Sequence, residues 1–129
     1  MGYTMSVQEL KQRFDTGKKP YLLDVREPYE YSLAKLEGSV LIPLGTLPQS
    51  MEKLDRNAEI VVYCHHGMRS ADAVGFLVQQ GFTNVKNLVG GIDAWSVQVD
   101  PTVPRYRLYT CQSNEYCAPV HHGKSQQSA

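Results

Sequence analysis

Residues 60–70 read Ile60-Val61-Val62-Tyr63-Cys64-His65-His66-Gly67-Met68-Arg69-Ser70. The first four are β-branched or aromatic, which is the composition of a buried strand. From Ser70 to Gln80 apolar residues recur at helical spacing, and Gly81 provides a C-terminal stop. The stretch therefore predicts a strand, a tight loop and a helix in direct succession.

The loop between this strand and this helix suits an anion. The first amide groups of a helix lack intrahelical partners and lie at the positive end of its dipole, so an anion is favoured there. Cys64 opens this loop, and we expect its thiolate form to be stabilised, with Arg69 adding a positive charge. Cys64 is therefore a candidate nucleophile. The alternative, which composition alone favours, is a small apolar residue of the core.

The bulk composition restricts the class of protein. The 129 residues suffice for one compact domain, and 13 basic residues balance 13 acidic ones without a Lys/Arg run that would indicate nucleic acid or an anionic membrane. No window is long and apolar enough for a membrane span, and the N-terminus does not resemble a signal peptide. Three cysteines do not form a disulfide framework. We expect a soluble, cytoplasmic monomer.

Strand and helix patterns alternate along the chain. A capping box at residues 6–9 starts the first helix, and the strand patterns cover residues 20–25, 39–43, 60–63 and 85–89. This alternation predicts an α/β fold, a parallel sheet flanked by helices. Asp24 and Arg26 lie at the carboxyl end of their strand, the edge at which ligands bind in such sheets.

The composition changes from about Asp100, where prolines appear and periodicity fades. We therefore predict a domain over residues 1–108, in which residues 105–109 can pack as an edge segment, and a flexible tail over 109–129. The tail carries two cysteines and two histidines whose spacing matches no zinc module, so we interpret them as incidental: Cys111, Cys117, His121 and His122. The alternative is that a tail cysteine resolves the covalent intermediate formed on Cys64.

Several short motifs occur together in a characteristic order. They are Leu23-Asp24-Val25-Arg26-Glu27 with Glu30-Tyr31, then Gly38 to Pro43, Tyr63 to Ser70, and Leu88 to Trp95. Together they resemble the rhodanese-like family, in the version found in single-domain sulfurtransferases and in the rhodanese module of adenylating enzymes that activate sulfur-carrier proteins. The resemblance implies a central parallel five-stranded sheet flanked by helices on both faces.

The resemblance also implies an activity, that of a thiosulfate sulfurtransferase. Cys64 would take a sulfane sulfur from thiosulfate or a similar donor, hold it as a persulfide and pass it to cyanide, a thiol or a sulfur-carrier protein, without a cofactor. The remaining loop residues would bind the substrate: His65, His66, Gly67, Met68, Arg69 and Ser70.

The individual side chains have separate expected roles. Arg69 can hold two oxygens of thiosulfate with its fork. Asp24 fixes Arg26 or loop amides, and Arg26 either shapes the pocket rim or pairs with a glutamate, Glu27 or Glu30. We expect His65 and His66 to supply a positive potential that varies around pH 6 to 7. We expect no metal there, because adjacent side chains point in different directions.

Two other functions remain open at this point. Phosphatases and arsenate reductases of similar architecture also use a cysteine and an arginine, but their loops place one more residue between the two than the four from His65 to Met68. A non-catalytic rhodanese-like module that binds or regulates a partner is the second alternative. Such modules typically lack the cysteine.

Overall fold

A computed structural model of the protein describes residues 3–107. Five parallel strands form one sheet in the order β1-β5-β4-β2-β3. Their bounds are β1 Thr4–Met5, β2 Tyr21–Asp24, β3 Val40–Leu41, β4 Ile60–Tyr63 and β5 Val85–Leu88. Because β4 lies in the middle of this order, the residue that follows it is surrounded by the carboxyl ends of its neighbours.

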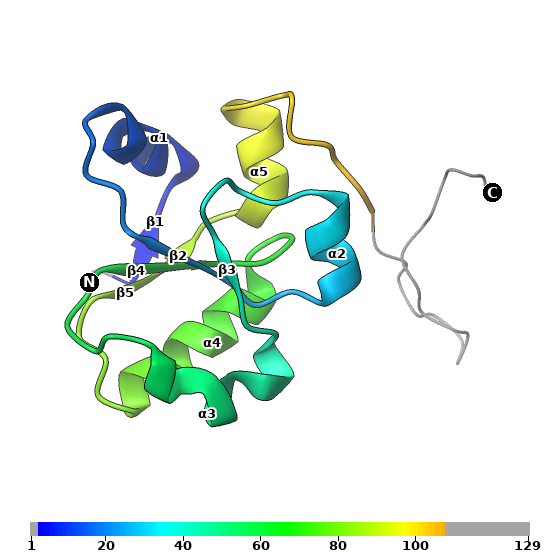
Figure 1. Cartoon of the computed structure of the whole chain (residues 1–129). Helices are drawn as coiled ribbons and strands as arrows, with labels where there is room; N and C mark the ends of the chain where they lie inside the picture. The colour runs from blue at the N-terminus through cyan, green and yellow to red at the C-terminus, as the bar shows by residue number, and fades with distance from the viewer. Residues whose placement is uncertain (1–2, 108–129) are drawn as a thin grey trace.

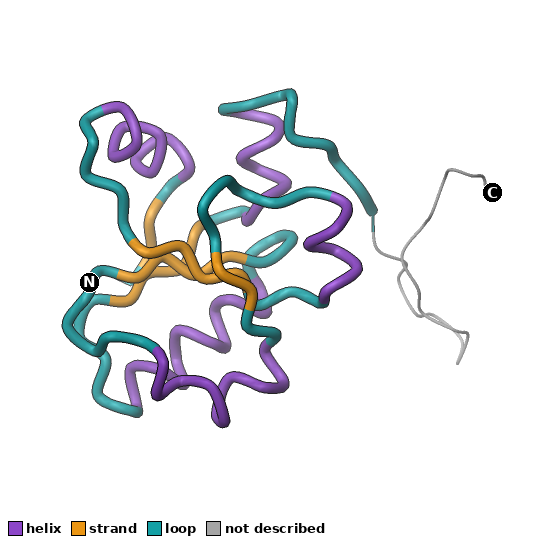
Figure 2. Tube along the Cα trace, in the orientation of Figure 1, coloured by secondary structure: helices purple, strands orange, loops and turns teal. Residues whose placement is uncertain are grey.

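Helices cover both faces of the sheet. Helices α1 (Val7–Asp15), α2 (Pro28–Leu33) and α5 (Gly91–Gln98) lie on one side, and α3 (Leu47–Ser50) and α4 (Met68–Gln79) lie on the other (Figure 1). Two 3-10 turns, Leu44–Thr46 and Met51–Lys53, flank α3. Figure 2 shows the twisted strands enclosed between the two helical layers. This is the architecture that the sequence predicted.

Each helical layer has its own apolar core. On the side of α3 and α4, Leu47, Ala73 and Leu77 form one buried apolar cluster with Val62 of β4. On the other side, the N-terminal and C-terminal helices pack on the opposite face of the sheet, with these buried members: Val7, Leu10, Val61, Tyr63, Ile92 and Trp95. The four residues of β4 are almost fully buried, as expected for a strand covered on both faces.

Two elements differ from the sequence prediction. The fifth strand is Thr4–Met5, which pairs with β5 and is too short to give a periodic pattern. The helix after the cysteine loop begins at Met68, two residues earlier than predicted, because Gly67 adopts a φ of 106° and serves as its N-cap. Arg69 therefore lies in the first turn of α4.

Residues 99–107 follow α5 and return to the domain, where the Tyr106 hydroxyl accepts a hydrogen bond from Arg26. Residues 105–107 form no strand, although Tyr106 packs against the core on the α5 side. The predicted tail over 109–129 lies outside the described residues, as do Cys111, Cys117, His121 and His122. Within residues 3–107, no helix is both long and apolar enough to cross a membrane.

Candidate active site

Cys64 is a free cysteine that directly follows β4, and hydrogen-bond donors face its sulfur. The backbone N–H of Gly67 donates to Sγ at 3.1 Å, and the N–H of Ser70 donates to it at 3.4 Å. The hydroxyl of Ser70 lies 3.4 Å from the same sulfur. The sulfur therefore sits in a cup of amides at the N-terminus of α4, a setting that favours an anion.

The same side chain is also part of the apolar core. Cys64 is 1 % exposed and belongs to the cluster that contains Leu23, Ala73 and Val74. The burial of Cys64 agrees with the interpretation as a core residue. The hydrogen-bond donors around its sulfur agree with the interpretation as a nucleophile. A buried sulfur that receives two amide hydrogen bonds is not an ordinary core thiol.

Asn87 of β5 holds the cup in place. Its Nδ2 donates to the carbonyl of Gly67 at 3.1 Å, which leaves its Oδ1 to accept a hydrogen bond from the Ser70 hydroxyl. Because a serine hydroxyl has one proton, Ser70 donates either to Asn87 or to Cys64 at any moment. When it donates to Asn87, its lone pairs are free to accept the proton of a neutral Cys64 thiol.

The N-terminus of α5 fixes the backbone of the loop. The N–H of Ile92 donates to the carbonyl of Cys64 at 2.9 Å, and that of Asp93 donates to the carbonyl of His65 at 3.1 Å. Gly91 has a φ of +64°, and a Cβ there would lie 2.4 Å from both of these carbonyl oxygens. Only glycine permits this approach, so Gly91 is the point at which the cysteine loop attaches to α5.

Arg69 is held by a glutamate. Its NH1 and NH2 donate to the two oxygens of Glu30 at 2.7 and 2.9 Å, and Glu30 is buried. These hydrogen bonds, against the opposing effect of burial, raise the pKa of Arg69, and a negative charge on Cys64 acts in the same direction. The guanidinium expected to hold thiosulfate is thus positioned by Glu30, and it lies within electrostatic reach of the sulfur.

Glu30 has further partners that stabilise its charge. Its carboxylate accepts hydrogen bonds from the Tyr106 hydroxyl at 2.9 Å and from the N–H of Glu27 at 3.1 Å. Burial alone would raise the pKa of Glu30, but the hydrogen bonds from Arg69, Glu27 and Tyr106 outweigh it and lower the pKa below its ordinary value. Glu30 is therefore a carboxylate at neutral pH.

Asp24 and Arg26 form a fully buried ion pair behind this network. Arg26 Nε and NH2 donate to the two carboxylate oxygens of Asp24 at 2.8 and 2.6 Å, and both side chains are 0 % exposed. Arg26 NH1 also donates to the Tyr106 hydroxyl at 2.8 Å. Asp24 thus fixes Arg26, whereas the suggested salt bridge of Arg26 with Glu27 or with the Glu30 carboxylate is wrong.

The two histidines have different surroundings. His65 is 3 % exposed, and its ring contacts those of His66 and Tyr106 at centroid distances of 4.1 and 4.2 Å. Burial, helped by the neighbouring His66, lowers the pKa of His65 to about 4. The prediction of a charge that varies around pH 6 to 7 is therefore wrong for His65. His66 is 63 % exposed and lies 3.5 Å from Asp93.

Met68 does not have the surroundings expected of a substrate-binding residue. It is 79 % exposed at the start of α4, so its side chain projects into solvent and does not line the buried sulfur. The structure brings the other predicted residues together around the loop and adds four that the sequence reasoning did not assign to the site: Glu30, Asn87, Asp93 and Tyr106.

These additional residues gave little signal in the sequence. Glu30 stood in the family motif and was considered only as a partner of Arg26, whereas in the structure it caps α2 through the N–H of Glu27 and holds Arg69. Asn87 lies in an ordinary strand pattern, and Tyr106 lies 76 residues beyond Glu30. Asn87 gave the one usable hint, because it is a polar side chain inside β5, the strand that pairs with β4.

Fold and loop together define a parallel α/β domain whose central strand ends at a cysteine in an amide-lined loop. The family model described as "Rhodanese-like domain" matches residues 6–98. The chain belongs to the rhodanese-like domain family.

Two relatives show the range of this kinship. The chain is 36 % identical over 107 residues to a probable adenylyltransferase/sulfurtransferase, MoeZ, of Mycobacterium tuberculosis. The alignment covers 81 % of this chain and 27 % of that protein. The chain is 37 % identical over 97 residues to a putative sulfurtransferase, YtwF, of Bacillus subtilis, with 75 % of this chain and 93 % of that protein covered. The chain therefore spans about a quarter of the first relative and nearly all of the second.

A solved structure agrees with the fold. The crystal structure of a rhodanese-related protein from Thermoplasma volcanium superposes with a TM-score of 0.70 at 33 % identity, covering 79 % of this chain and 97 % of that one. The protein is thus a rhodanese-like domain with relatives that are named sulfurtransferases.

Proposed function

We propose that the protein transfers sulfane sulfur from thiosulfate, or a donor of similar chemistry, through a persulfide on Cys64. The Cys64 thiolate attacks the outer sulfur of thiosulfate, the sulfur–sulfur bond of the donor breaks, and sulfite leaves with the bonding electron pair. An acceptor thiolate or cyanide then attacks the outer sulfur of the persulfide and regenerates the Cys64 thiolate. No net oxidant or metal is needed for this exchange.

The observation that carries this proposal is the set of donors on Sγ. The amides of Gly67 and Ser70 reach the sulfur at 3.1 and 3.4 Å. Preorganised backbone N–H groups stabilise negative charge in a site of low dielectric. They suit both the attacking thiolate and the anionic outer sulfur of the persulfide.

Arg69 supplies the fixed charge that draws the donor anion. A guanidinium has five N–H donors, and the pairing with Glu30 uses only part of them. Cys64 is 1 % exposed, so the donor reaches its sulfur only when the groups that cover the sulfur shift.

The acceptor in this proposal is a protein thiol or a sulfur-carrier protein. One relative, 39 % identical over 92 residues and covering 71 % of this chain, is a putative sulfur carrier protein, YrkF, of Bacillus subtilis. The adenylyltransferase/sulfurtransferase MoeZ carries a similar domain within a longer chain. A reducing compartment such as the cytoplasm keeps the Cys64 thiol available for such a relay.

A steady-state assay with thiosulfate and cyanide tests this function. We expect parallel double-reciprocal lines, which indicate a covalent intermediate, and a loss of at least about 10³-fold in kcat/KM for Cys64→Ser. The matched control is Cys111→Ser together with Cys117→Ser, which changes the other two cysteines and leaves the rate unchanged. A wild-type protein that transfers no sulfur would favour the non-catalytic module, and hydrolysis of an aryl phosphate that depends on Cys64 would favour the phosphatase.

A further inference from the structure

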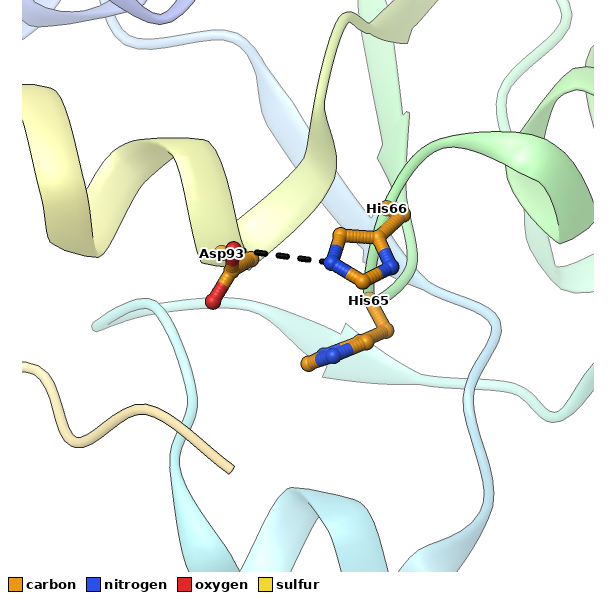
Figure 3. A group of neighbouring side chains, drawn as sticks. All are labelled: His65, His66 and Asp93. Carbon is orange, nitrogen blue, oxygen red and sulfur yellow. Dashed lines mark ion pairs between the residues drawn. The ribbon is translucent and has the colours of Figure 1, made fainter. Parts of the chain in front are cut away.

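Three side chains with metal-binding atoms converge beside the cysteine loop. His65 and His66 come from the loop, and Asp93 comes from the first turn of α5, as Figure 3 shows. One ligand atom from each lies within 4.8 Å of the other two. The sequence suggested that the adjacent histidines point apart, but their ring centroids are 4.1 Å apart, and both rings lie beside the carboxylate.

An independent feature of His65 points to a missing partner. Its Nδ1 is buried and has no hydrogen-bond partner. Among the described residues, 3–107, no other buried side-chain nitrogen or oxygen lacks a partner. A buried polar atom without a partner is destabilising, so a group that pairs with it is favoured there. Nothing in the proposed sulfur transfer uses this nitrogen.

We propose that His65, His66 and Asp93 bind a divalent transition-metal ion, of which Zn²⁺ is the representative. Two imidazole nitrogens and one carboxylate oxygen are the donors that Zn²⁺ accepts, and a fourth position stays open for water. Bonds of roughly 2.0–2.1 Å hold donor atoms roughly 3.4 Å apart in a tetrahedron, so the present group must contract. His66 can make this movement because it is 63 % exposed.

Arg105 competes with the ion for Asp93. Its Nε and NH2 donate to the two carboxylate oxygens at 2.8 and 3.0 Å, and its side chain is 63 % exposed. Exposed ion pairs are weak, so an ion with a net charge of two can displace the guanidinium or share the carboxylate with it. Removing this arginine should therefore strengthen metal binding, whereas removing a ligand weakens it.

Calorimetric titration with ZnCl₂ alone tests the site on the full chain. To remove other candidate ligands, the parent protein carries Cys64→Ser, Cys111→Ser, Cys117→Ser, His121→Ala and His122→Ala. We expect one Zn²⁺ per chain, at least tenfold weaker binding in His66→Ala and in Asp93→Asn, and tighter binding in Arg105→Gln. His66 and Arg105 are exposed, so the His66→Ala and Arg105→Gln proteins should fold, and circular dichroism checks this.

Two results would overturn the proposal. One is a parent protein that shows no saturable uptake of Zn²⁺. The other is uptake of equal strength in the parent, His66→Ala and Asp93→Asn proteins. Neither result bears on the proposed sulfur transfer, which is measured without added metal.

Discussion

The cysteine loop takes the donors around its sulfur from the backbone of Gly67 and Ser70, within six residues of Cys64. The charged network beside it collects side chains from distant parts of the chain, with Arg26 and Tyr106 separated by 80 positions. The donors of the loop are backbone N–H groups, which face the sulfur because Gly67 permits the turn. The network exists only when every charged partner is present.

This difference separates stability from chemistry. A buried charge that loses its partner is costly, so substitutions in the network should lower the free energy of unfolding strongly. The donors around Sγ matter when negative charge gathers on the sulfur, so the loop should dominate the rate of sulfur transfer. The first three variants below are arranged from the largest expected effect on stability to the smallest, and a pH titration follows them.

Asp24→Asn should have the largest effect, a loss of about 3–5 kcal/mol, because it leaves the guanidinium of Arg26 buried without a countercharge. Urea unfolding measures the change. The matched control is Asp15→Asn, which removes an exposed partner of Lys11 and should cost less than about 1 kcal/mol. Similar losses in the two variants would show that the buried pair has no special weight.

Gly91→Ala should cost about 2–3 kcal/mol, because the new Cβ would lie 2.4 Å from the carbonyls of Cys64 and His65 at a positive φ. Gly75→Ala in the middle of α4 is the control, since nothing lies within 4 Å of a Cβ there. It should stabilise the helix by up to about 1 kcal/mol. If thermal or urea unfolding gives both variants the same sign, the attachment of the loop to α5 is looser than the structure indicates.

Tyr106→Phe should cost about 1–2 kcal/mol, because it removes the hydroxyl that accepts from Arg26 and donates to Glu30 while it keeps the ring on His65. Tyr3→Phe, at a site that is 51 % exposed, should change stability by less than about 0.5 kcal/mol. An unchanged unfolding midpoint in Tyr106→Phe would mean that the segment after α5 contributes nothing to the network.

The pH dependence of stability isolates Glu30. Because its folded pKa lies below its unfolded value of about 4.3, its contribution is complete above that pH and is lost as the pH falls through the folded pKa. The stability difference between wild type and Glu30→Gln should therefore be largest near neutral pH and shrink below about pH 4.

Glu52→Gln is the control for this titration, since Glu52 is exposed and its nearest cation is 3.9 Å away. Its stability should equal that of wild type at each pH. A gap between wild type and Glu30→Gln that stays constant down to pH 2 would contradict the assigned role of the Glu30 carboxylate.

Local signals made much of this predictable. The alternation of patterns gave the parallel sheet, the motif order indicated the family, and Cys64 with its following helix indicated the amide cup. Thr4–Met5 escaped detection because two residues cannot show a period. The sequence also placed the helix start too late, because the turn depends on the conformation of Gly67.

The contacts of the network were beyond a reading of the sequence for a physical reason. Whether Arg69 faces the sulfur or Glu30 depends on where α2 lies relative to α4, and no local pattern encodes that placement. The pKa of His65 follows from burial under Tyr106, which comes from the far end of the domain. Long-range packing, and not residue type, decided both.

Intact mass spectrometry after incubation with thiosulfate tests the sulfur chemistry of Cys64 most directly. We predict that the wild-type chain gains about 32 Da, the mass of one sulfur atom, and that the added mass disappears on treatment with cyanide. Cys64→Ser should gain nothing, and the Cys111→Ser/Cys117→Ser chain should gain the same mass as wild type. A wild-type chain of unchanged mass, or an equal gain in Cys64→Ser, would contradict a persulfide on Cys64.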